Sequence, residues 1–158
     1  MAERTRHESC VDTWLERSSA RGLPREALMD LFEAAVVALW ARTSTTLGDV
    51  TLTAIADRIL HQAAEKYPAF ASLSIDADGR LAAHGLRSNM DAINHLKLVE
   101  GMRSVLVDFL TVVGNLTADL LTADLHAELR SVTLDADARP AASPPERPKA
   151  ARRQRGAR

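Results

Sequence analysis

The stretch VEGMRSVLVDFLTVVGNLTADLL, which spans residues 99–121, decides the fold. Its large apolar side chains recur at alternating spacings of three and four residues, the heptad pattern of a helix that buries one face against other helices. This apolar seam consists of Val99, Met102, Leu106, Phe109, Val113, Leu116 and Leu120. We therefore expect a long helix over residues 88–121, with Ser88 as its N-cap.

A second apolar row on the same helix bears on assembly. Leu98, Val105 and Val112 add to the seam, and the two rows offer more surface than one short neighbouring helix covers. We therefore expect a homodimer with the seam as its interface. Gly101 and Gly114 lie inside the helix and weaken it by about 1 kcal/mol each relative to Ala, which favours close approach of other elements at these positions.

Four further segments have the helical period of apolar residues. They are residues 9–21, 24–46, 51–66 and 122–132, the third of them capped by Asp49 or Thr51. Aromatic residues make up only 4% of the chain, so the core must be built from Leu, Val, Ile and Ala, which favours helices over a β-sandwich. The predicted fold class is mainly α, a bundle of about five helices with one long heptad-patterned helix.

Residues 72–84 have a different pattern, in which Leu73 and Ile75 alternate with polar residues. Alternation of this kind is typical of a half-buried strand. Asp78-Gly79 follows, and this dipeptide is a favoured two-residue turn between antiparallel strands. We predict a short β-hairpin at the edge of the helical domain.

The last part of the chain differs from the rest in composition. Residues 135–158 are rich in Ala, Pro and Arg and contain no large apolar side chain, so we expect a disordered basic tail after a helical domain over residues 1–134. Residues 1–138 hold 13 Lys+Arg and 20 Asp+Glu, a net charge of −7, whereas residues 139–158 hold 7 and 1, a net charge of +6. A tail of this charge is a candidate contact for nucleic acid or an acidic protein, and the alternative is a tail that only keeps the protein in solution. Its candidate contact residues are Arg147, Lys149, Arg152, Arg153, Arg155 and Arg158.

Two features suggest histidine chemistry. Asp57, His61 and Glu65 are spaced by four residues, which places them near one face of a helix, where two of them and ligands from elsewhere would hold a metal ion. The alternative is a solvent-exposed polar face. His95 precedes Leu96-Lys97 and resembles the histidine of phosphotransfer modules, although its spacing to the lysine differs from theirs. The alternative is a residue at the boundary of the seam. We predict no cofactor.

The segment LTAIADRI, residues 52–59, resembles the first helix of many helix-turn-helix regulators, and the predicted hairpin resembles the wing of a winged-helix domain. The resemblance implies a DNA-binding regulator in which the long helix after the wing forms the dimer. No turn signal follows Ile59, however, and no recognition helix rich in Arg, Lys, Asn or Gln is present. The acidic charge of residues 1–138 also opposes contact with phosphates.

The common catalytic motifs are missing from the sequence. It has no phosphate-binding glycine loop, no nucleophile elbow and no helical H-E-x-x-H pair, and its one cysteine, Cys10, has no partner for a disulfide. Charged residues at positions 3–8 leave no apolar export signal, and the aspartates within residues 105–121 exclude a membrane span there.

We therefore predict a cytoplasmic, non-enzymatic regulatory or protein-interaction module without membrane contact. It acts through helix packing, as a homodimer and with an unidentified protein partner, and its tail offers a route to nucleic acid. The alternatives are a winged-helix-like DNA-binding transcriptional regulator and a signalling protein with a helical metal or phosphotransfer histidine site.

Overall fold

The computed structural model of the chain describes residues 2–19, 23–76 and 78–132. The predicted tail over residues 135–158, with its six candidate contact residues, lies outside the described residues. The fold is mainly α with one small antiparallel hairpin, as predicted. The α-helices of the described part are α1 (Ala2–Ser19), α2 (Arg25–Leu47), α3 (Asp49–Lys66), α4 (His84–Ser88), α5 (His95–Leu116) and α6 (Thr122–Ser131). The short elements are the 3₁₀ helices η1 (Pro68–Ser72) and η2 (Met90–Ala92) and the strands β1 (Ser74–Ile75) and β2 (Leu81–Ala82).

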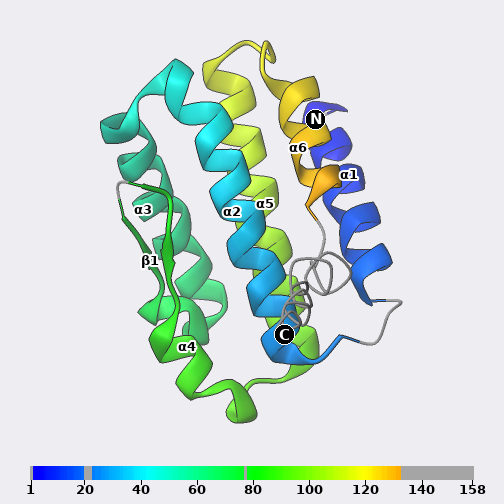
Figure 1. Ribbon diagram of the computed structural model, residues 1–158, viewed down its shortest axis with the longest axis vertical. Coiled ribbons are helices and arrows are strands. Elements are labelled where there is room, and N and C mark those ends of the chain that lie inside the picture. Colours follow the sequence, from blue (N-terminus) through cyan, green and yellow to red (C-terminus); the bar gives the residue numbers. More distant parts are fainter. Residues whose placement is uncertain (1, 20–22, 77, 133–158) are drawn as a thin grey trace, which may run out of the picture.

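The long helices form a bundle around α5, which contacts α1, α2, α3 and α6. In Figure 1, α1 and α6 lie together on one flank of the bundle, and α3 with the hairpin lies on the other. The α2–α3 junction and the α5–α6 turn lie at the same end of the bundle, opposite α4. The first and last described helices are therefore neighbours, although they are far apart in the sequence.

The apolar seam divides into a buried part and an exposed part. Met102, Leu106, Phe109 and Val113 are buried in the core of this one chain, because α5 is surrounded by helices of the same chain. Leu116 and Leu120, in contrast, are 57% and 82% exposed. Helices of the same chain thus cover the buried part of the seam, which is not available as the predicted dimer interface. Leu116 and Leu120, at the end of the seam, remain accessible to a second copy.

The long helix is shorter at both ends than predicted. It begins at His95 rather than residue 88, because the Asn94 side chain caps it by accepting a hydrogen bond from the backbone N–H of Leu96 at 2.7 Å. Ser88 is not its cap but the last residue of α4. At the other end α5 stops at Leu116 rather than residue 121.

A left-handed turn ends α5. The Asp119 N–H donates to the Gly114 carbonyl at 2.8 Å and the Ala118 N–H to the Asn115 carbonyl at 3.4 Å, the hydrogen-bond pattern of a Schellman motif. The left-handed position in this motif usually holds glycine, but Ala118 has a φ of 51° and Asp119 a φ of 65°. That conformation costs a non-glycine residue about 1–2 kcal/mol.

Two other helix starts differ from the prediction. The first helix begins at Ala2 instead of residue 9, because its charged first turns find partners: Arg4 pairs with Glu8 at 3.3 Å one turn later and with Asp108 of α5 at 3.2 Å. The third helix includes the predicted cap Asp49 as its first residue, and Gly48 precedes it with a φ of 84°.

The hairpin forms where it was predicted, with a longer turn. Ser74 pairs with Ala82 and Ile75 with Leu81. The last bonded pair is Asp76 with Arg80, so the loop has one residue more than the predicted two-residue turn. Gly79 provides the positive φ that such a loop needs.

The two glycines of α5 lie at close contacts, as predicted. A Cβ on Gly101 would lie 2.5 Å from Cζ of Phe70, so glycine lets η1 pack directly on the α5 backbone. A Cβ on Gly114 would lie 3.0 Å from Oδ1 of Asp119 and 3.3 Å from Nε2 of His7. The second glycine therefore makes room for polar side chains from α1 and from the α5–α6 turn.

Candidate functional site at the contact of the first and last helices

The predicted metal residues lie on the outer face of α3. His61 Nε2 is 3.5 Å from Glu65 Oε2, and the two side chains are largely exposed. Among the described residues, no group of three His, Cys, Asp or Glu side chains is placed to hold a metal ion. Asp57, His61 and Glu65 therefore share one face of α3, and no other residue in the described part of the chain completes a metal site with them. His95 is the exposed first residue of α5.

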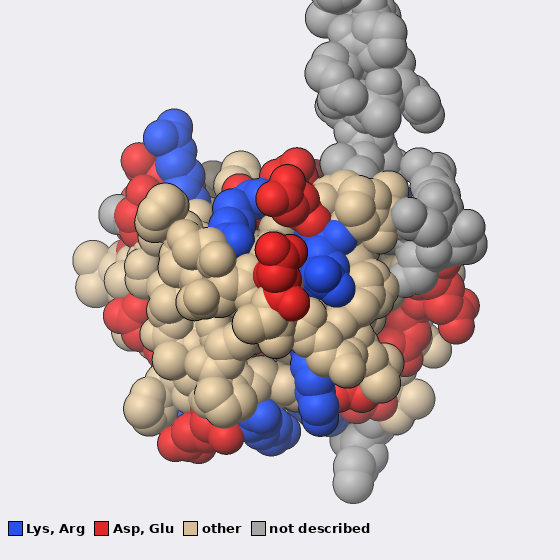
Figure 2. Space-filling view, turned by 90° about the horizontal axis from the view of Figure 1, so that it is seen from below, with Lys and Arg blue, Asp and Glu red and all other residues tan. Residues whose placement is uncertain are grey.

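The segment that resembles a helix-turn-helix regulator is one continuous helix. Residues 52–59 belong to α3, which runs without a break to Lys66 and is followed by η1. The turn and second helix of that motif are therefore missing between α3 and the hairpin. Figure 2 shows Lys and Arg side chains interspersed with Asp and Glu side chains on the lower face of the molecule. That face does not form a basic surface for phosphates.

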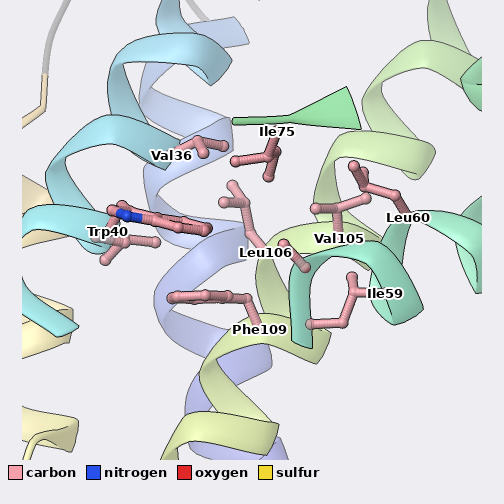
Figure 3. A pocket seen from close by; sticks show the side chains of 10 residues that line it. Val36, Trp40, Ile59, Leu60, Ile75, Val105, Leu106 and Phe109 are labelled. Atoms are coloured by element: carbon pink, nitrogen blue, oxygen red, sulfur yellow. The ribbon is translucent and has the colours of Figure 1, made fainter. Parts of the chain in front are cut away.

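A small apolar cavity lies between α2, α3, α5 and β1. Figure 3 shows Phe109 and Leu106 of α5 facing Trp40 of α2, with Ile75 of the hairpin above them. Its volume is about 20 Å³, which is room for roughly one water molecule. The indole N–H of Trp40 is buried and finds no hydrogen-bond partner among the described residues. The cavity is a small packing defect in the core.

Two histidine side chains form a hydrogen bond between α1 and α6. His7 is 1% exposed, and its Nδ1 lies 2.9 Å from Nε2 of His126, which is 119 residues later in the sequence. The two rings are nearly perpendicular, with an interplanar angle of 88°. A hydrogen bond between two imidazole nitrogens needs one N–H donor and one unprotonated acceptor. At least one of the two facing nitrogens must therefore be free of a proton.

Acidic and polar groups of the α5–α6 turn complete this cluster. The Thr122 hydroxyl donates a hydrogen bond to Oδ1 of Asp119 at 2.7 Å. Oδ1 of Asp119 and Nε2 of His7 both lie next to Gly114, because each would contact a Cβ atom placed on that glycine. Asp119 therefore lies on the Nε2 side of the His7 ring, whereas Nδ1 contacts His126, and the negative charge of Asp119 favours the protonated form of His7.

Burial is the main influence on both histidines. It lowers the pKa of His7, an effect that Asp119 opposes and that Arg6 and Arg4 reinforce. Burial also lowers the pKa of His126, with further lowering by His7, Arg130 and Arg6 and opposition from Asp119. Each ring therefore favours its neutral form more strongly in the folded protein than in the unfolded chain.

Cys10 lies next to this pair. Its Sγ is 4.0 Å from the backbone oxygen of His126. Burial raises the pKa of the Cys10 thiol, and the neighbouring Arg130 only partly opposes that shift. A protonated thiol is a poor nucleophile, so the arrangement at Cys10 favours packing over nucleophilic chemistry.

Two further side chains of α1 hold the end of α6. The indole N–H of Trp14 donates to the Val132 carbonyl at 3.0 Å, and the Arg17 guanidinium donates to the Arg130 carbonyl at 3.3 Å. The last carbonyls of a helix have no partners within the helix, so these bonds satisfy groups that otherwise need water. We call the three contacts His7–His126, Trp14–Val132 and Arg17–Arg130 the α1–α6 latch.

Sequence reasoning missed the latch. Its histidines lie near opposite ends of the described chain, and only the bundle brings them together. A local signal was present on α1, where His7, Val11 and Trp14 are spaced by four and three residues and are all buried. This spacing continues the apolar face into the charged first turns of the helix.

No protein-family model matches the chain, and neither a curated protein nor a solved structure is significantly similar to it. Of the described helices, none has the length and hydrophobicity that crossing a bilayer requires. Function is therefore inferred from the side chains and their contacts.

Proposed function

We propose that the protein is a non-enzymatic regulatory or interaction module of the cytoplasm, and that it works by releasing α6 from the bundle. The observation that carries this proposal is the hydrogen bond of 2.9 Å between the buried His7 and the partly buried His126. Histidine is the side chain whose ordinary pKa lies nearest to physiological pH. A contact between the first and last helices that depends on a neutral imidazole is therefore a contact that mild acid weakens.

The charges around the pair decide the response to protonation. If both rings are protonated, both facing nitrogens carry protons, so the hydrogen bond is lost and two positive rings lie side by side. Arg6, Arg4 and Arg130 add to the positive potential at the pair, while Asp119 opposes it. Arg4 is itself partly neutralised by its ion pairs with α1 and α5. One negative charge thus faces two protonated rings, and the balance favours separation of α6 from α1.

Release of α6 exposes apolar surface on both sides of the contact. Leu125 and Leu129 of α6 are fully buried, as is Trp14 of α1, which reaches the end of α6. A freed amphipathic helix and the groove that it leaves are both surfaces that bind partner helices. The latch therefore supports a module that exposes its binding surface when α6 is released.

We expect the folded protein to lose stability as the pH falls below about 6.5, the ordinary pKa of histidine. Both folded-state pKa values are lowered, so the unfolded chain binds more protons than the folded chain between the folded-state pKa values and 6.5. The free energy of unfolding therefore falls with pH in this window and is fully retained above it. Urea unfolding followed by circular dichroism, between pH 8 and pH 5, measures the change.

Matched variants isolate the latch in this experiment. The double variant His7→Gln/His126→Gln removes both titrating rings, so its loss of stability below pH 6.5 should be smaller than that of the natural chain. His84→Gln is the control, because His84 is exposed on α4, and it should leave the pH dependence unchanged. If the natural chain and the double variant lose stability in parallel, the latch does not sense pH and the proposed function is wrong.

A further inference from the structure

The five residues that join α5 to α6 have a helical sequence in a non-helical conformation. Residues 117–121 contain neither glycine nor proline, yet the backbone turns through two successive left-handed residues, Ala118 and Asp119. The heptad pattern of α5 continues through this turn to Leu120. The turn therefore interrupts a helix that the local sequence favours.

The interruption leaves the end of the seam uncovered. Leu116 and Leu120 are 57% and 82% exposed, while the seam residues Phe109 and Val113 before them are buried. If the helix continued past residue 116, the two leucines would extend the same stripe as Val113. A stripe of this kind is stable only against another apolar helix.

We infer that α5 and α6 form one continuous helix in a second state of the protein, in which two copies exchange α6. The straightened helix carries its α6 into the groove that the other copy's α6 has left. His7, Trp14 and Arg17 of each copy then make the latch contacts with the α6 of the other. This inference rests on one part of the proposed function, the departure of α6 from the bundle, and not on the pH dependence of that departure.

Three features favour exchange with a second copy over other occupants of the groove. The exchanged α6 is identical to the one it replaces, so every side-chain contact of the latch is available again between chains. Straightening the turn relieves the left-handed conformation of Ala118 and Asp119 in both copies. The extended helices also bring the leucines at positions 116 and 120 of the two chains to one interface, where they cover each other.

The first test is the oligomeric state and the path of the chain within the dimer. We expect light scattering after size-exclusion chromatography to resolve monomer and dimer over about 5–500 µM, a range that brackets weak self-association. Arg130 of α6 lies beside Cys10 of α1. The variant Arg130→Cys therefore places a second thiol close to the native thiol of Cys10, across the contact between α1 and α6. A short bifunctional thiol reagent should then yield a covalent dimer from the dimer fraction and an internally linked chain from the monomer fraction.

The second test changes the turn itself. Ala118→Gly favours the left-handed turn and disfavours the continuous helix, so it should raise the dissociation constant of the dimer by about tenfold or more. Ala127→Gly is the matched control, because Ala127 is exposed within α6, and it weakens the helix in both states. The control should leave the dissociation constant within about threefold of the natural value.

The outcomes separate this inference from the proposed function. A monomer at every concentration, a dimer whose chains are linked only internally, or equal effects of the two glycine variants would each overturn the exchange. None of these results touches the pH dependence of the latch, which the histidine variants test. A pH-insensitive latch combined with a covalent dimer would instead retain the exchange and contradict the release of α6 by acid.

Discussion

The variant Phe109→Asp is expected to be unfolded at every pH near neutrality. Phe109 is buried among α2, α3 and α5 and lines the small core cavity. An aspartate there would face the described apolar side chains that line this cavity, none of which is a cation, and burying an unpaired charge costs more than about 4 kcal/mol. That is a large part of the total stability of a domain of this size. Far-ultraviolet circular dichroism of the purified variant, compared with the natural chain, measures the loss of helix.

Leu120→Asp is the matched variant at the other end of the same seam. Leu120 is 82% exposed, so an aspartate at this position stays hydrated, and the monomer should melt within a few degrees of the natural chain. The same change should abolish the exchanged dimer, which needs Leu120 covered. If Leu120→Asp unfolds the monomer as Phe109→Asp does, the division of the seam into a buried and an exposed part is wrong.

Trp14→Ala is expected to destabilise the protein by about 3–5 kcal/mol, the usual range for truncating a buried tryptophan. Trp14 is fully buried and its indole N–H is a donor to α6 through the Val132 carbonyl. Trp14→Phe keeps most of the apolar contact and removes that donor, so it should cost about 1 kcal/mol, the usual net contribution of one hydrogen bond, because the Val132 carbonyl is only partly buried. Urea unfolding gives both values.

Trp40→Phe is the control for the lost hydrogen bond. Trp40 is buried like Trp14, but its N–H has no hydrogen-bond partner among the described residues. The substitution therefore removes apolar contact but breaks no hydrogen bond. It also removes the buried indole N–H, which is unfavourable in the folded protein because it has no acceptor among the described residues. Trp40→Phe should be less destabilising than Trp14→Phe. The reverse order would show that the Trp14–Val132 bond contributes little to holding α6.

The buried part of the bundle was predictable because its pattern is local. Met102, Leu106 and Phe109 share one face by helical period alone, and Gly101 within the helix correctly indicated close approach by another element. The hairpin was predictable for a similar reason, since Gly79 supplies a conformation that other residues avoid. In both cases the residues near in sequence carry most of the physical cause.

The ends of the helices and the latch depend on contacts between distant residues. Nothing in residues 117–121 signals a break, because the left-handed turn is held by the Gly114 carbonyl and lies beside His7 of another helix. The helical start of α1 likewise depends on Asp108 of α5. Asp57, His61 and Glu65 form no metal site among the described residues for a related reason. A spacing of four residues places side chains on one face of a helix, but further ligands must come from another element, which the local sequence does not specify.

Hydrogen exchange of the α6 amides is the most direct test of the latch as a release mechanism. After correction for the intrinsic exchange rate, hydrogen exchange gives the free energy of the opening that exposes each amide. This opening free energy should be lower for the amides of Leu125 and Leu129 than for those of Leu106 and Leu110 in α5. That opening free energy should fall further as the pH drops from 7.5 to 5.5. If the α6 amides share the opening free energy of α5 at every pH, or if their opening is independent of pH, α6 is not released by protonation of His7 and His126.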